Sequence, residues 1–299
     1  MQAFGRVVSG QFPEYLIRPL LIIVGIVTLE YLGGGILTPT TALGANVTGV
    51  AVAFVVGALL LKRALPDTLR SVRPEFVTNE WLRASLPMML ISGVWMANNY
   101  VATLMVGTLD GPRAAGVYSV VQKGAEVIIL VLIATNMPLA PAVARLHARK
   151  DWQGLEQTTE HMARATLLAS APIAVAFMVF PHVYLGLFGA SFQTGATALI
   201  ILAFGQLINA AAGPSGNILV MTGHERVAVR GVAAGLLANI VLAVVLVPPL
   251  GVTGGAIAFA ASLVLWNTAL VVLARRLAGV NVTAFRRFAM FQHAHGSPS

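Results

Sequence analysis

The chain alternates between long apolar runs and short polar connections. A helix that spans a bilayer needs about 20 mainly apolar residues, and about eight such runs can be placed along the sequence. They cover roughly residues 16–37, 41–61, 86–106, 115–139, 165–188, 195–220, 231–247 and 254–274. Turn-forming residues separate them, as in Asp110-Gly111-Pro112. The pattern predicts an all-α, polytopic helical membrane protein.

Composition supports a membrane protein. The chain is 57% hydrophobic and only 10% charged, whereas a soluble domain is about 25% charged. It has no Cys, so disulfides and thiolate metal sites are excluded. The net charge of +8 would favour nucleic acid as the partner of a soluble protein. Here most cations flank the apolar runs, so we expect contact with membrane lipids and no nucleic-acid binding.

The basic residues collect in alternate connections. They lie in the connections after the second, fourth and sixth runs and in the tail, as Lys62, Arg149, Arg226 and Arg275 illustrate. The connections between these carry only Arg113. The positive-inside rule then predicts that both termini are cytoplasmic. An even number of spans agrees with this orientation.

Polar segments divide the chain into four parts. Residues 1–62 hold two predicted helices and residues 84–285 hold six. Between them, residues 63–83 are polar and are predicted to form a cytoplasmic linker. Residues 286–299 are predicted to be a disordered cytoplasmic tail.

Polar side chains interrupt the fourth predicted span. At 100° per residue, Tyr118, Gln122, Lys123 and Glu126 fall within an arc of about 140°. Lys123 and Glu126 can pair as i,i+3 neighbours. Ionisable groups inside a membrane usually face protein or a water-filled cavity. Two interpretations follow: a structural ion pair between helices, or a cavity-lining group that binds an anionic substrate or carries a proton.

Glu30, in the first span, poses a similar choice. It is a candidate for ion coupling, and equally a candidate for a structural polar contact at an interface.

The sixth span carries a second polar stripe. Gln206, Asn209, Gly213 and Asn217 lie within an arc of about 80°. Pro214 removes a backbone hydrogen bond and is predicted to kink the helix as a hinge. A kinked polar seam is typical of a moving cavity wall, although Gly and Asn also serve ordinary helix packing.

Asparagines on other spans are weaker candidates. Of Asn98 and Asn99, one is expected to face inward and the other to pack, and Asn98 is a candidate for substrate binding. Asn239 and Asn267 are expected to join helices by hydrogen bonds.

The sequence predicts no enzyme, no cofactor and no metal site. His224-Glu225 begins like a zinc-binding HExxH motif, but Ala228 stands where the second His is needed. Paired carboxylates for a glycosidase or transferase are also missing from the polar segments.

Several segments carry a family resemblance. In order, residues 110–119 (DGPRAAGVYS), 136–141 (NMPLAP), 187–192 (LFGASF), 205–223 (GQLINAAAGPSGNILVMTG) and 248–258 (PPLGVTGGAIA) resemble segments of lipid-linked polysaccharide flippases. These flippases are members of the multidrug/oligosaccharidyl-lipid/polysaccharide exporter superfamily. The resemblance covers roughly residues 6–285.

The resemblance implies a two-lobe helical transporter in the bacterial cytoplasmic membrane, which moves a polyprenyl-diphosphate-linked oligosaccharide across that membrane by alternating access. A cationic cavity would hold the diphosphate, and Lys123 is the best match to that requirement. Gln122, Tyr118, Gln206, Asn209 and Asn98 would contact substrate. Glu126 and Glu30 would couple ions. Glycan-assembly proteins are a further expected class of partner.

Family members usually have twelve to fourteen spans, so about four N-terminal helices of the first lobe are expected to be missing here. Residues 1–62 would be the remnant of that lobe and residues 84–285 the complete second lobe. Two alternatives remain: a multidrug/cation antiporter of the same superfamily, or a non-transporting membrane subunit that scaffolds glycan-assembly enzymes.

Overall fold

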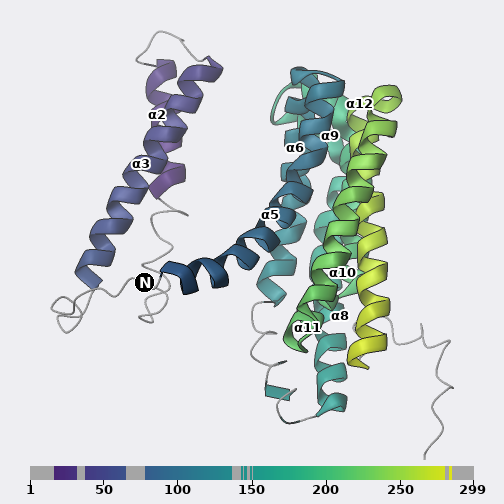
Figure 1. The fold of residues 1–299 in the computed structure, drawn as a ribbon. Coiled ribbons are helices and arrows are strands. Elements are labelled where there is room, and N and C mark those ends of the chain that lie inside the picture. The colour runs from purple at the N-terminus through teal and green to yellow at the C-terminus, as the bar shows by residue number, and fades with distance from the viewer. Residues whose placement is uncertain are drawn as a thin grey trace, which may run out of the picture. The chain divides into compact units, whose positions relative to one another are not determined.

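The computed structural model describes residues 17–31, 38–64, 78–136, 143, 145–146, 149, 151–279 and 283–284. Every regular element in these residues is a helix (Figure 1). The chain divides into two compact units, Met1–Thr78 and Asn79–Ser299.

The first unit contains α2 (Arg18–Tyr31) and α3 (Pro39–Ala64), which pack against each other. The start of α3 is capped reciprocally. Thr41 N donates to Thr38 Oγ1 at 3.3 Å, and Thr38 N donates to Thr41 Oγ1 at 2.9 Å. Pro39 follows the capping residue, where its missing N–H costs no helical hydrogen bond. Local sequence therefore fixes where this helix begins.

The second unit contains the remaining elements: α5 (Thr78–Leu109), α6 (Pro112–Asn136), α8 (Trp152–Val179), α9 (Pro181–Gly186), the 3₁₀ helix η3 (Ala190–Gly195), α10 (Ala196–Ala212), α11 (Ser215–Met221) and α12 (Glu225–Ala278). Helix α10 contacts α6, α8 and α12, so it is the central helix of this unit. Its buried side chains include Leu199, Leu202 and Gln206.

Helix α12 is a hairpin rather than one straight helix. Gly251 interrupts it with φ 53° and ψ −131°, a conformation that L residues rarely adopt. Gly231 faces Leu270 and Gly235 faces Trp266, which is the register of two antiparallel halves. Figure 1 shows these halves side by side. The predicted spans 231–247 and 254–274 are therefore the two halves of α12.

The predicted kink in the sixth span is a complete break. Helix α10 ends at Ala212 and α11 begins at Ser215. Between them, Gly213 has φ 69° and ψ −170°, and Pro214 has no N–H to continue the helical ladder. The break therefore follows from two adjacent residues whose backbone properties oppose a helix.

The fold class is confirmed. Five helices in the described residues are long and apolar enough to cross a membrane: Thr40–Leu60, Pro112–Thr135, Trp152–Val179, Ala190–Ala212 and Glu225–Leu277. Leu237, Val241 and Val245 on α12 are more than half exposed. Their i,i+4 spacing forms an apolar stripe that suits contact with lipid.

Some helices extend beyond the predicted spans. Helix α8 begins at Trp152, well before the predicted start at residue 165, because Asp151 caps it by accepting from Gly154 N at 2.8 Å. Helix α5 begins at Thr78, inside the predicted linker 63–83. Hydropathy identifies only the apolar part of a helix, so polar first turns were missed. Residues 65–77 and the predicted tail 286–299 lie outside the described residues.

Candidate functional site

Two of the predicted substrate contacts on α6 face the protein interior. Tyr118 is buried, and its hydroxyl donates to Gly255 O at 3.4 Å. The amide of Gln122 accepts from Thr103 Oγ1 at 2.7 Å and donates to Asn99 O at 2.6 Å. These side chains therefore join α6 to α5 and α12.

Lys123 and Glu126 lie on the exposed side of α6. Lys123 Nζ is 2.7 Å from Glu126 Oε2, so the predicted i,i+3 pair is present. The two side chains are 61% and 36% exposed. The pair lies within one helix and does not connect two helices, in contrast to the structural interpretation drawn from the sequence. The structure thus divides the predicted polar face into a buried half and an exposed half.

A cavity of about 560 Å³ lies within the second unit. Helices α5, α6, α8, α10, α11 and both halves of α12 contribute to its walls. Its polar lining residues are neutral: Asn99, Thr166, Gln206, Asn209, Ser215, Asn217 and Asn267. Phe259 and Trp266 add aromatic surface. Among the described residues that line this cavity, none is ionisable.

Three of these amides form a chain of hydrogen bonds. Asn267 Nδ2 donates to Asn209 Oδ1 at 3.0 Å, and Asn209 Nδ2 donates to Gln206 Oε1 at 3.1 Å. Asn267 Nδ2 also donates to Leu263 O at 2.9 Å, inside its own helix. The chain links α10 to the second half of α12 across the cavity wall.

The two ends of the amide chain have complementary hydrogen-bonding capacity. Gln206 and Asn267 are 1% and 5% exposed. Among the described residues, Gln206 Nε2 has no acceptor and Asn267 Oδ1 has no donor. A donor and an acceptor therefore remain available in a largely buried wall. This arrangement fits a neutral polar ligand, because each ligand hydroxyl can both donate and accept.

The other predicted residues lie elsewhere. Asn98 is buried and accepts from Asn239 Nδ2 through its backbone O and its Oδ1, both at 3.3 Å. Its neighbour Asn99 is the one that lines the cavity. Pro214 lines the cavity at the α10–α11 break. Glu30 lies in α2, and its side chain is outside the described residues.

Sequence reasoning missed the contribution of α12 to the cavity. Asn267 was expected only to join helices, and Trp266 and Phe259 were not singled out. A single Asn or Trp on an apolar helix gives the same sequence signal in a packed core as in a cavity wall. The polar seam on the sixth span was the available signal. Its amides need hydrogen-bond partners on another helix, but the seam does not identify which helix supplies them.

Comparisons with known proteins place the chain in a family. The MatE family profile matches residues 87–245, which is more than half of the chain and runs from α5 into the first half of α12. An uncharacterized membrane protein of Methanocaldococcus jannaschii is 21% identical over 201 residues. That alignment covers 63% of this chain but only 40% of the archaeal protein. No solved structure matches the chain significantly. The chain belongs to the MatE family, whose members are membrane transporters of the multidrug/oligosaccharidyl-lipid/polysaccharide exporter superfamily.

Proposed function

We propose that this protein takes part in translocating a polyprenyl-diphosphate-linked oligosaccharide across the bacterial cytoplasmic membrane. The observation that carries the proposal is the neutral cavity with its chain of amides and two aromatic side chains. Its volume of about 560 Å³ lies within the usual range of small-molecule sites.

A sugar matches this lining chemically. Sugar hydroxyls are neutral and both donate and accept, so they complement Gln206 Nε2 and Asn267 Oδ1. The C–H faces of a sugar ring are apolar and can lie against Trp266 or Phe259. Each neutral hydrogen bond contributes about 0.5–1.5 kcal/mol, so several such contacts would hold a glycan without trapping it.

The diphosphate requires a cation, and we assign it to Lys123 on the exposed side of α6. A charged pair is costly in lipid, so this side of α6 should face water or protein. Binding would exchange the carboxylate of Glu126 for a phosphate oxygen and leave Glu126 available for coupling, together with Glu30. Gln122, Tyr118 and Asn98 would join substrate contact only by giving up their present hydrogen bonds to the protein.

A cation antiporter is less consistent with the cavity. Cationic drugs need carboxylates to offset their charge when they leave water. In the part of the chain that the structure describes, the lining has amides and hydroxyls instead. A non-transporting scaffold would not need an open donor and acceptor in a buried wall.

Transport can be tested with reconstituted protein and a labelled polyprenyl-diphosphate oligosaccharide. We expect the protein to accelerate movement of this lipid between the leaflets of liposomes. Gln206→Leu should reduce that rate severalfold because it removes the open donor. Gln193→Leu, an identical change at an exposed position of η3, is the matched control. Equal rates for both variants, or no acceleration by the native protein, would contradict the proposal.

A further inference from the structure

Thr283 and Ala284, which follow α12 in the sequence, contact helices of the second unit. Helix α12 ends at Ala278, and Gly279 has φ 66°. Ala284 then lies against α8 and α10 and is only 4% exposed. Its carbonyl accepts from Arg164 Nε at 3.0 Å, and its N–H donates to Ala211 O at 3.0 Å. We call Arg164, Ala211 and Ala284 the clasp.

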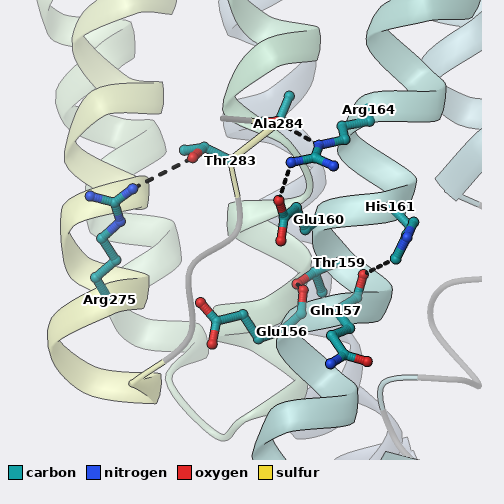
Figure 2. Close-up of polar contacts among 9 residues, drawn as sticks. All are labelled: Glu156, Gln157, Thr159, Glu160, His161, Arg164, Arg275, Thr283 and Ala284. Carbon is teal, nitrogen blue, oxygen red and sulfur yellow. Dashed lines mark hydrogen bonds and ion pairs between the residues drawn. The ribbon is translucent and has the colours of Figure 1, made fainter. Parts of the chain in front are cut away.

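Arg164 is held on two sides. One nitrogen of its guanidinium pairs with Glu160 one turn earlier on α8, while Nε bonds Ala284 (Figure 2). Thr283 is placed nearby by a long contact of 3.5 Å to Arg275 Nη2 on α12. The planar guanidinium donates in fixed directions, so the pair with Glu160 aims Nε at Ala284.

Ala284 donates a hydrogen bond to the carbonyl of Ala211, which the α10–α11 break leaves without its helical donor. In a continuous helix, Ala211 O would accept from Ser215 N. Ser215 N instead bonds Gly213 O at 2.9 Å, and Pro214 has no N–H. The N–H of Ala284 takes the vacant place at 3.0 Å. The clasp is therefore attached to the hinge itself.

The hinge is part of the cavity wall. Ala210 and Gly213, on either side of Ala211, both line the cavity, as does Thr166 on α8 close to Arg164. A shift of α11 relative to α10 would change the shape of the wall at Asn217. It would also change the environment of Ala211 O.

We propose that Arg164 is a positioning residue. It holds Ala284 against the end of α10 at the α10–α11 break, and this contact limits how far the cavity opens at α11. Release of the clasp lets α11 move and increases access to Ser215, which lines the cavity at the start of α11 and is only 1% exposed. The proposal rests on the proposed function only in assigning this motion to transport. Access to the cavity can be measured without any substrate.

The test uses the absence of Cys from the native sequence. Ser215→Cys places one thiol at the start of α11, in the cavity wall, at a buried position. Its reaction rate with a charged, water-soluble maleimide is then measured in membrane vesicles. Adding Arg164→Ala should raise this rate by about 10-fold to 150-fold, as expected when a charged hydrogen-bond donor is lost. Arg164→Lys should restore much of the slow rate, because Lys can still donate to Ala284 O.

Two controls separate release of the clasp from general loosening. Arg276→Ala removes an exposed arginine from α12 and should leave the rate unchanged. Ala243→Cys reports on a position in α12 that is 0% exposed. An unchanged rate at Ser215→Cys in the Arg164→Ala background overturns the proposal. So does an equal increase at Ala243→Cys, since Arg164 would then support the whole fold. If the native protein does not accelerate glycan translocation but Arg164→Ala still raises the labelling rate, the proposed function is rejected and the proposal for the clasp stands.

Discussion

Replacing Gly235 with Ala tests how closely the two halves of α12 pack behind the cavity. A Cβ at Gly235 would lie 2.7 Å from Trp266 Cε3 and 3.0 Å from Trp266 Cβ. Rotating the indole cannot relieve the second contact, because that atom is fixed to the backbone. The halves must therefore separate by a few tenths of an ångström. Since Trp266 lines the cavity, its ring would also move into the ligand space.

The change in the free energy of unfolding is the difference between two opposing terms. Gly to Ala in a helix interior gains about 0.8–1 kcal/mol, whereas overpacking costs about 1–3 kcal/mol. The net effect is a destabilisation of about 0–2 kcal/mol. A change of 1 kcal/mol shifts the melting temperature by about 2–4 °C in a domain of this size. We therefore expect Gly235→Ala to melt a few degrees below the native protein.

Gly216→Ala is the matched control. A Cβ at Gly216 would meet Leu270 Cδ1 at 3.7 Å, which is ordinary van der Waals contact, so the helical gain should dominate and raise stability slightly. Thermal unfolding of both variants in the same detergent, followed by circular dichroism, provides the comparison. If Gly235→Ala melts at or above the native protein and alongside Gly216→Ala, the close packing inferred for α12 is wrong.

Three further substitutions address other parts of the structure. Asn267→Leu breaks the amide chain and leaves Asn209 Oδ1 without its donor, so glycan translocation should fall about 2- to 10-fold, as follows from losing one neutral hydrogen bond. An unchanged rate in the liposome assay would remove Asn267 from the site. Gly251→Ala forces a Cβ into φ 53° and ψ −131°, at a cost of about 1–3 kcal/mol. A melting temperature equal to that of the native protein would argue against the hairpin. Lys123→Ala should abolish glycan export in a complementation assay at normal protein level, and normal export would reject its role with the diphosphate.

The elements of the fold were largely predictable because each depends on local sequence. Apolar runs locate the helices, and Gly213 with Pro214 marks the α10–α11 break without any tertiary information. The hairpin of α12 follows in the same way from the turn residues around Gly251. Helix ends were less predictable. The first turns of α8 are polar, and only the cap at Asp151 shows that they are helical.

The cavity was only half predictable because its walls are distant in sequence. The stripe of Gln206 and Asn209 was visible on one helical wheel. Its partner Asn267 lies 58 residues after Asn209, and no periodicity within either helix connects them. The clasp was not predictable at all. Arg164 meets Ala284 across 120 residues, and an Ala carries no sequence signal for a backbone contact.

The polar residues of α6 show why a shared arc does not define a shared environment. An arc of about 140° covers more than a third of the helix circumference, so one edge can face neighbouring helices while the other faces outward. Tyr118 and Gln122 are buried by contacts with α12 and α5, whereas Lys123 and Glu126 are not. The ionisable groups are therefore kept out of the neutral cavity. On the proposed function, this separation matches the substrate, because neutral sugars and a charged diphosphate need different surroundings. A cation inside the cavity would instead pair with the diphosphate there and compete with sugar binding.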